Sequence, residues 1–330
     1  MMKRLFRPFN LALWRRAAHD AQWLLAACTA ITFGFCWLFV WLISRLQTGR
    51  LREILKLIPD EFETFLRVPA DFLTSYAGRI AVAYDDPVVY MTVAVWAIAR
   101  ASDAVSGPLG RGTMELVLSQ PVSRTQVLLS NAAITVVGIV VISASAWLGT
   151  AAGVATVQVE KEPERIRVPL FNIEFGNPFQ GQKEPEYEPM SLHTRAHYYL
   201  PAAASLAAMG VFLAGVTTLL SATDRYRWRT IAIIAGFFVV QMIIKVAAVA
   251  VPALGWLAYF TFFGAYEPQQ WVYYAAERPE TAWSYLLLTT EGAWRAPGPL
   301  MCHLTLVLLG LISYAAAVVV FCRRDLPAPV

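Results

Sequence analysis

Charged residues are scarce in this chain of 330 residues. Asp, Glu, Lys and Arg together make up 15% of it, whereas hydrophobic residues make up 57%. Soluble globular proteins have about 25% charged residues. The composition therefore excludes an ordinary soluble domain and indicates an integral membrane protein. The net charge of +4 is small and gives no reason to expect a nucleic-acid partner.

The chain also has few cysteines and lacks a nucleotide-binding loop. Its four cysteines are Cys28, Cys36, Cys302 and Cys322, and isolated thiols of this kind are usually small, buried, apolar residues. The sequence contains no G-x-x-x-x-G-K-[ST] motif, so it has no P-loop to bind nucleotide phosphates. We therefore expect neither a catalytic residue nor a cofactor in this chain.

Six apolar runs are long enough to cross a bilayer, which takes about 20 residues each. They cover residues 23–44, 87–105, 127–153, 200–220, 231–253 and 300–322. The second run is the weakest, because Arg100 and Asp103 lie near its end. These two side chains are three residues apart and can pair on one helix face. The pattern predicts an all-α membrane protein with a single transmembrane domain over residues 1–330.

Basic residues are unevenly distributed among the connecting segments. With the N-terminus inside, the cytoplasmic segments carry an excess of Lys and Arg, and the outer segments carry an excess of Asp and Glu. Cytoplasmic loops of membrane proteins are enriched in Lys and Arg. We therefore expect both termini in the cytoplasm and the chain in the cell (inner) membrane. The first run is too long for a cleaved signal peptide and predicts an uncleaved signal anchor.

The segments between the runs differ in character. Residues 1–22 are basic and amphipathic, which predicts a helix along the inner interface. Residues 50–67 have apolar residues at near-helical spacing and are expected on the outer surface. Residues 154–199 are expected to form a polar outer loop. Within this loop, the pattern of residues 165–173 predicts a short strand. Residues 254–299 form a second outer segment, whose apolar run 254–263 is too short to span and suits a re-entrant or interfacial helix.

Residues 106–126, between the second and third runs, contain two helix starts and one stop. Thr113 is placed to cap a helix whose first turn carries Glu115, and Pro121 ends that helix near Gln120. Ser123 and Gln126 then form the S-x-x-Q pattern of a capping box, which starts the third span. We predict a helix of about two turns across the inner face of the membrane. An ordinary interfacial loop helix is the alternative interpretation.

The string "RGTMELVLSQPVSRTQVLLSN" resembles the motif between the second and third spans of type-2 ATP-binding-cassette (ABC) transporter permeases, which have the type V exporter fold. The matching residues are Arg111, Gly112, Thr113, Glu115, Leu116, Leu118, Pro121, Val122, Ser123 and Arg124. The resemblance extends to the segments "YEPQQWV" and "FCRRDLPAP". The family usually has an acidic residue shortly before R-G-T, where this chain reads Ser106, Gly107, Pro108 and Leu109.

The resemblance implies a permease subunit that exports or flips a substrate by alternating access. It implies a coupling helix that docks on a separate cytoplasmic ABC ATPase, which would bind ATP and Mg, and a homodimer or heterodimer of permeases in the lipid membrane. The implied coupling residues are Arg111, Gly112, Thr113, Glu115, Leu118, Gln120, Pro121 and Arg124. Residues 224–229, "DRYRWR", are a second candidate contact, although anchoring of the neighbouring span explains them equally well.

Two further features suggest other functions. Lys245 lies near the middle of the fifth run, where a charge costs about 2.5–3.5 kcal/mol, so it is a candidate for the substrate pathway or a gate, or else a structural hydrogen-bonding residue. His193 and His197 are four residues apart, a spacing that puts two imidazoles on one helical face. No third ligand accompanies them at a suitable spacing, so we expect polar loop residues and no metal.

Three alternative functions remain open. An ion-coupled secondary transporter would use Lys245, Arg100 and Asp103, but the inverted repeats and broken helices typical of that class are not evident in the sequence. A membrane-bound enzyme would centre on His193 and His197. A membrane scaffold would bind an extracytoplasmic partner through the loop at 156–198. The fold does not select a substrate.

Overall fold

The computed structural model describes residues 11–46, 68–161, 165–168, 173–176, 186–288 and 295–325. The predicted outer segment at 50–67, the first ten residues of the N-terminal segment and the end of the C-terminal "FCRRDLPAP" string lie outside the described residues. Six described helical stretches are long and apolar enough to cross a membrane, and this confirms the all-α, six-span prediction. They are Leu11–Arg45, Tyr76–Ser102, Arg124–Thr156, Ala196–Thr223, Arg227–Ala250 and Pro299–Arg323.

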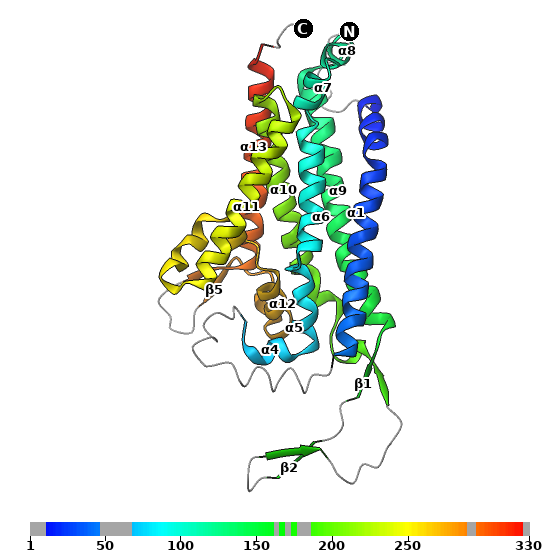
Figure 1. Cartoon of the computed structure of the whole chain (residues 1–330), viewed down its shortest axis with the longest axis vertical. Coiled ribbons are helices and arrows are strands. Elements are labelled where there is room, and N and C mark those ends of the chain that lie inside the picture. The colour runs from blue at the N-terminus through cyan, green and yellow to red at the C-terminus, as the bar shows by residue number, and fades with distance from the viewer. Residues whose placement is uncertain are drawn as a thin grey trace.

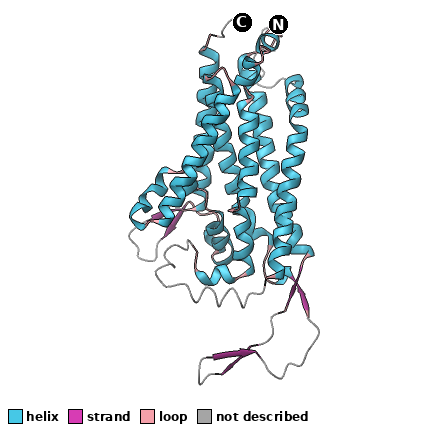
Figure 2. Cartoon of the chain, viewed as in Figure 1, coloured by secondary structure: helices cyan, strands magenta, loops and turns pink. Residues whose placement is uncertain are grey.

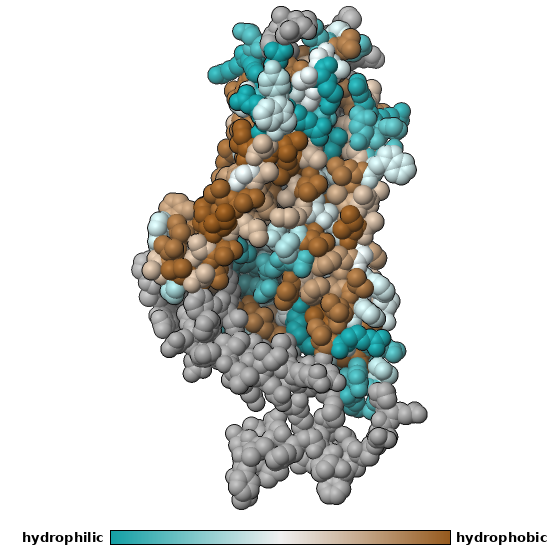
Figure 3. Space-filling model, viewed as in Figure 1, coloured by the Kyte–Doolittle hydropathy of each residue, from teal (hydrophilic) through white to brown (hydrophobic). Residues whose placement is uncertain are grey.

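The long helices form one elongated bundle (Figure 1). They are α1 (Leu11–Arg45), α6 (Pro87–Ser102), α9 (Arg124–Thr156), α10 (Leu200–Thr223), α11 (Arg227–Ala250) and α13 (Pro299–Arg323). Helix α10 is the most buried of them and packs against α13, α6 and α9, while α1 packs along α9. Figure 3 shows a broad hydrophobic band across the middle of the face in view, as expected of a surface that faces lipid.

The two ends of the bundle differ in their elements. One end, here called the α8 end, carries α7 (Ser106–Gly110), α8 (Met114–Leu118), the start of α1 and the end of α13 (Figure 1). Hydrophilic atoms gather there in Figure 3. The opposite end, the β1 end, carries the short helices α4 (Ala70–Thr74) and α5 (Tyr76–Ala81) and the strand β1 (Gln158–Glu160).

The predicted polar loop at 154–199 begins later than expected, because α9 continues to Thr156. Strand β1 pairs with β4 (Tyr187–Pro189), and β2 (Arg165–Val168) pairs with β3 (Ile173–Gly176), both antiparallel. The single strand predicted at 165–173 is therefore a pair of strands, shown in magenta in Figure 2. The one-turn helices η3 (Met190–Leu192) and η4 (Ala196–Tyr199) lead into α10.

The described residues of the segment at 254–299 form short elements. They are η5 (Pro252–Phe260), η6 (Phe262–Gly264), α12 (Pro268–Glu277), η7 (Pro279–Thr281) and the antiparallel pair β5 (Leu286–Leu288) and β6 (Arg295–Pro297). The nine residues of η5 do not form a membrane-spanning helix. This agrees with the sequence, in which the apolar run at 254–263 is too short to cross a bilayer.

The first two spans differ from their predicted bounds. Residues 11–22 continue directly into the first span as part of α1, rather than forming a separate interfacial helix. Their small residues Ala17 and Ala21 are buried, so this part of α1 packs on the bundle. The second span starts earlier than predicted and is interrupted: α5 passes into η2 (Val82–Tyr84), and α6 begins at Pro87. The side chain of Asp86 accepts a hydrogen bond from the Val88 amide and caps the new helix.

Close backbone contact joins α10 to α13. A Cβ atom added to Gly215 would lie 2.2 Å from the carbonyl oxygen of Gly310, and one added to Gly310 would lie 2.7 Å from that of Val211. Only residues without a side chain allow two helices to approach so closely. The two helices therefore pack as a tight pair.

The four cysteines are free. Cys28, Cys36 and Cys302 are buried, as predicted for apolar core residues, but Cys322 is exposed at the α8 end. The prediction was wrong for Cys322 because the neighbouring Phe321 takes the buried position in the last turn of α13, and Cys322 lies on the exposed side of that turn.

Candidate functional site

The 106–126 connector consists of two short helices at the α8 end, followed by the start of α9. Helix α7 ends at Gly110, Gly112 has a φ of +69°, and α8 covers Met114–Leu118. Glu115 lies in the first turn of α8, as predicted. Helix α8 is shorter than the two turns expected and ends at Leu118, before Gln120 and Pro121.

Thr113 does not cap α8. Its backbone has φ −92° and ψ −7°, and its side chain makes no capping hydrogen bond. Instead its amide donates to the carbonyl of Pro108 at 2.9 Å, and its hydroxyl donates to the same oxygen at 3.4 Å. Thr113 therefore closes the turn after α7. The prediction failed because the left-handed conformation of Gly112 brings Thr113 back over α7.

The predicted capping box at the start of α9 is confirmed. The Ser123 hydroxyl accepts a hydrogen bond from the Gln126 amide at 3.2 Å, and the Ser123 amide donates to the Gln126 side-chain oxygen at 3.0 Å. Both interactions satisfy amide groups that a helix start would otherwise leave without partners. The connector is thus joined to the third span by a well-defined helix start.

Helix α8 has one buried and one exposed face. Met114 is buried in a small cluster with Leu128 and Phe321, and Leu118 packs against the same cluster. Leu116 points the other way and is 70% exposed, beside the exposed Glu115. Leu116 belongs to the family motif but was not among the predicted docking residues. Met114 and Leu118 are four residues apart and share a helix face, so Leu116 lies on the opposite face. The exposure of Leu116 could therefore have been predicted from the sequence.

Apart from Arg124, the remaining predicted docking residues fall into two groups. Arg111, Gly112, Gln120 and Pro121 are exposed. By contrast, Thr113 and Leu118 face their own chain, as described above. A partner can therefore reach the exposed group from outside, whereas contacts through Thr113 or Leu118 would require the connector to shift.

Asp103 joins the connector to two spans. Its carboxylate lies 2.9 Å from Nη1 of Arg111 and 3.4 Å from Nη1 of Arg227 at the start of α11. The predicted Arg100–Asp103 pair is absent from the ion pairs of the described residues, because Arg100 instead donates to the carbonyl of Ala17 at 3.3 Å. Asp103 thus provides an acidic partner for the arginine of the R-G-T motif from eight residues upstream.

Two arginines tie the connector to the end of α13 and to α10. Nη1 of Arg124 donates to the carbonyls of Phe321, Cys322 and Arg324, at 3.0, 3.4 and 2.6 Å. Nη1 of Arg324 donates in turn to the carbonyls of Ala222 and Asp224, at 3.0 and 3.1 Å. Carbonyls at helix C-termini carry partial negative charge and favour cations. The guanidinium of Arg124, predicted to contact a partner, therefore makes its described contacts within its own chain.

Residues 224–229 also make internal contacts. The Asp224 carboxylate accepts hydrogen bonds from the amides of Arg225 and Tyr226 and lies 3.5 Å from Nε of Arg229. Arg227 donates to the carbonyl of Ala99 at 3.0 Å. These contacts fix the start of α11 against the end of α6.

Lys245 lies nearer the β1 end of α11 than its sequence position suggested. Helix α11 ends at Ala250 because Val251 is extended before Pro252, so Lys245 occupies its last two turns rather than its middle. Nζ of Lys245 lies 3.5 Å from Oδ1 of Asp85, at the interruption of the second span. Both side chains line a cavity of about 360 Å³.

Aromatic residues border this charged pair. Nζ of Lys245 lies 5.5 Å from the ring centre of Phe263 and 5.8 Å from that of Tyr266. The Tyr266 hydroxyl donates to the carbonyl of Tyr84. Burial and the nearby Asp85 carboxylate raise the pKa of Tyr266 well above its usual value, so this phenol stays protonated and remains a donor.

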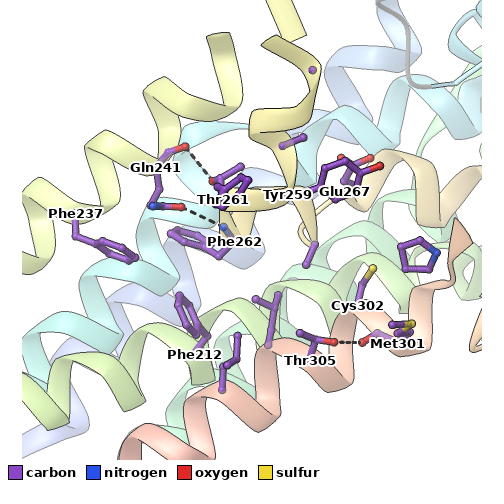
Figure 4. Close-up of a pocket in the computed structure, with 18 residues that line it drawn as sticks. Phe212, Phe237, Gln241, Tyr259, Thr261, Phe262, Glu267, Met301, Cys302 and Thr305 are labelled. Carbon is purple, nitrogen blue, oxygen red and sulfur yellow. Dashed lines mark hydrogen bonds between the residues drawn. The ribbon is translucent and has the colours of Figure 1, made fainter. Parts of the chain in front are cut away.

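A larger cavity of about 620 Å³ lies between α10, α11, η5 and α13. Figure 4 shows Phe212, Phe237 and Phe262 along one side, with Cys302 and Met301 along another. Gln241 joins α11 to the segment at residues 261–262. Its side-chain oxygen accepts a hydrogen bond from the Phe262 amide at 3.2 Å, and its carbonyl accepts one from the Thr261 hydroxyl at 3.1 Å. The lining is mostly apolar, as in small-molecule sites.

The two histidines do not share a helix face. His193 follows η3, and His197 lies in η4. Nε2 of His193 lies 3.4 Å from Oε2 of Glu188. Within the described residues, no group of three or more His, Cys, Asp or Glu side chains could hold a metal ion.

The fold defines a multi-pass helical membrane protein, and the connector motif at its α8 end points to a transporter component. Residues 22–171, which include the connector, match the family model described as ABC-2 family transporter protein. This match confirms the resemblance to the type-2 ABC permeases and supports a permease, the membrane component of an ABC transporter rather than its ATP-binding subunit. Such a permease works with an ABC ATPase subunit. A comparison with curated proteins finds no match.

Proposed function

We propose that this chain is the permease subunit of an ABC exporter or flippase and that its α7–α8 connector docks on a separate cytoplasmic ATPase. The observation that carries the proposal is the division of α8 into two faces. Met114 fixes one face in the bundle, while Leu116 and Glu115 are exposed on the other. An apolar side chain surrounded by polar groups at a water-facing end is typical of a contact surface.

The contacts around the connector suit the transmission of force. Asp103 links it to α6 and α11, the capping box links it to α9, and Arg124 links it to α13. Moving a two-state gate from 1:99 to 99:1 requires about 5.5 kcal/mol of differential binding. A docked ATPase that closes on ATP and Mg would deliver this energy to four helices at once.

The same proposal assigns the α8 end to the cytoplasm of the cell (inner) membrane and the β1 end to the outside. The excess of Lys and Arg in the segments at the α8 end supports this orientation. The proposal also includes a dimer of permeases, either identical or paralogous, because the connector of each copy would then engage one of two ATPase subunits.

The docking surface can be tested with Leu116→Asp. Leu192, in η3 at the β1 end, is equally exposed at 70%, so Leu192→Asp is a matched control. We expect tagged wild-type protein and Leu192→Asp to recover an ATPase from native membranes in mild detergent, and Leu116→Asp to lose at least about 90% of it, because burying a carboxylate at an apolar contact is unfavourable.

All three proteins should insert and melt alike, since Leu116 and Leu192 are exposed. Equal recovery of the ATPase with Leu116→Asp and with the wild type would contradict the assignment of the docking surface to Leu116. Recovery of no ATPase with the wild type would contradict the proposed function itself.

Ion-coupled transport is the second candidate function. It is favoured by the interruption of the second span beside the Asp85–Lys245 pair, since broken helices next to charged residues are typical of ion-coupled transporters. Uptake or efflux in vesicles that depends on an ion gradient, without any bound ATPase, would support this candidate over the first.

A further inference from the structure

We propose that the cavity at Asp85 and Lys245 is a binding site for an amphiphilic ammonium compound, whose charged group takes the place that the Lys245 ammonium now occupies. The proposal rests on the proposed function in one respect: if the chain is a permease, such a compound is the class of molecule that it transports. Binding at this site does not depend on an ATPase.

The immediate surroundings of Nζ of Lys245 are those of a cation site. One carboxylate oxygen of Asp85 lies at 3.5 Å, and the rings of Phe263 and Tyr266 lie at 5.5 and 5.8 Å. Aromatic faces carry negative potential, so they attract ammonium groups within about 6 Å. The same faces repel anions, which argues against a site for phosphate or carboxylate groups.

The remainder of the cavity suits an apolar group. Beyond the charged pair and the rings of Phe263 and Tyr266, its wall is formed by Tyr90 of α6 and by four residues from the last turns of α11, which are Met242, Val246, Val249 and Ala250. The cavity volume of about 360 Å³ lies within the roughly 300–1,000 Å³ of small-molecule sites. A ligand with an ammonium group at one end and a short apolar chain at the other matches both parts.

Lys245 is placed so that it can leave. It lies in the last two turns of α11, and a long lysine side chain near the end of a span can extend toward the interface. Exchange of one ammonium for another keeps the charge of the site balanced against Asp85. Lys245 therefore competes with the ligand. The apparent affinity for the ligand equals the affinity of the vacated site multiplied by the fraction of molecules in which Lys245 has left it.

Removal of the competing charge should therefore tighten binding. We would place the full chain in nanodiscs of phosphatidylglycerol, which has no ammonium group, and titrate hexyltrimethylammonium by saturation-transfer NMR, with empty nanodiscs subtracted. We expect Lys245→Met to bind this probe about tenfold more tightly than the wild type. Lys245→Arg should keep the wild-type affinity, because it keeps a cation in the site. Adding Asp85→Asn to Lys245→Met should abolish the gain.

A purely structural ion pair gives the opposite results. Binding to Lys245→Met no tighter than to the wild type, or equally tight binding to the Asp85→Asn/Lys245→Met variant, would overturn the proposal. Neutral hexanol should not distinguish any of the proteins. Because this assay contains no ATPase, its failure would leave the docking proposal unaffected.

A measurement on the wild type avoids variants that fail to fold. Bound hexyltrimethylammonium, which has no reactive amine, should displace Lys245 and speed its acylation by an amine-reactive reagent, as read by mass spectrometry. An unchanged rate at saturating probe would overturn the proposal.

The natural ammonium group can come from a lipid or from a soluble compound. Competition by phosphatidylethanolamine, added to the nanodiscs with Lys245→Met, would identify a lipid headgroup as the source. Undiminished probe binding in its presence would identify a soluble amphiphilic amine.

Discussion

Gly112 is the residue at which the chain turns from α7 to α8, and its φ of +69° favours glycine. A Cβ added here would meet no atom within 4 Å, so Gly112→Ala tests conformation without a steric clash. We expect it to cost about 1–2 kcal/mol and to reduce ATPase recovery, because α8 would shift. Thermal melting and co-purification would measure both effects.

Gly236 provides the control for this change. It lies inside α11, and a Cβ added there also meets no atom within 4 Å. Gly236→Ala should leave stability unchanged or raise it by up to about 1 kcal/mol. A Gly112→Ala protein that melts and binds the ATPase like the wild type would show that the turn tolerates an ordinary residue.

Local chemistry could be predicted from the sequence at the residue scale, but long-range pairing could not. The capping box was predictable because Ser123 and Gln126 are three residues apart and need no other partner. The Asp85–Lys245 pair joins residues 160 positions apart, and only the packing of α11 beside the second span brings them together. Arg100 and Asp103 misled the prediction because nearer partners in space, Ala17 and Arg111, compete for them.

At the scale of elements, the α10–α13 pair depends on two glycines in contact. Gly215→Ala would place a Cβ 2.2 Å from the carbonyl oxygen of Gly310, so the two helix backbones must separate. We expect a loss of about 1–3 kcal/mol, as for other overpacked sites. Unfolding in nanodiscs by heat or denaturant would measure it.

Gly34 of α1 is the matched control for this helix contact. It lies within a span, but a Cβ added there meets no atom within 4 Å. As for Gly236→Ala, Gly34→Ala should therefore leave stability unchanged or raise it by up to about 1 kcal/mol. If Gly215→Ala were as stable as Gly34→Ala, the close approach of α10 and α13 would contribute nothing to stability.

The presence of the spanning helices was predictable, because long apolar runs have few alternative structures. The positions at which a helix is interrupted were not predictable. The second span was expected to start at residue 87, yet its helical stretch starts at Tyr76 and is interrupted at residues 85–86. The polar "DDP" sequence there marks the new helix start at Pro87, but it does not show that α5 continues the same span on the other side. Packing of α5 against α12 decides that, and it is a tertiary effect.

At the scale of the whole molecule, the orientation can be tested with a native residue. Cys322 is exposed at the α8 end, whereas Cys28, Cys36 and Cys302 are buried. A membrane-impermeant maleimide should therefore label the wild-type chain in inside-out vesicles and leave it unlabelled in intact cells. Cys322→Ser should abolish the labelling. Labelling of Cys322 from outside intact cells would reverse the proposed topology.

The links from Arg124 through Arg324 to α10 predict a cooperative α8 end. Arg324→Gln removes the two charged hydrogen bonds to Ala222 and Asp224, each of which contributes about 1–3 kcal/mol. Amide hydrogen exchange should accelerate by about tenfold or more at the ends of α10 and α13, while the β1 end is unchanged.

Arg323 offers a control one residue away. It has the same charge and is exposed, and no hydrogen bond from its side chain is found within the described part of the chain. Arg323→Gln should exchange like the wild type. Equal acceleration in both variants would mean that net charge, rather than the specific contacts of Arg324, holds this end together.

The hydrogen bond from Tyr266 to the carbonyl of Tyr84 has a consequence for biogenesis. Tyr84 lies at the interruption of the second span, and its hydrogen-bonding partner is synthesised 182 residues later. A break in a helix at membrane depth leaves backbone groups that must find partners within the protein. During translation the second span therefore inserts with this carbonyl unsatisfied by Tyr266, and its final form is reached only after the fifth span and the segment that follows it have left the ribosome.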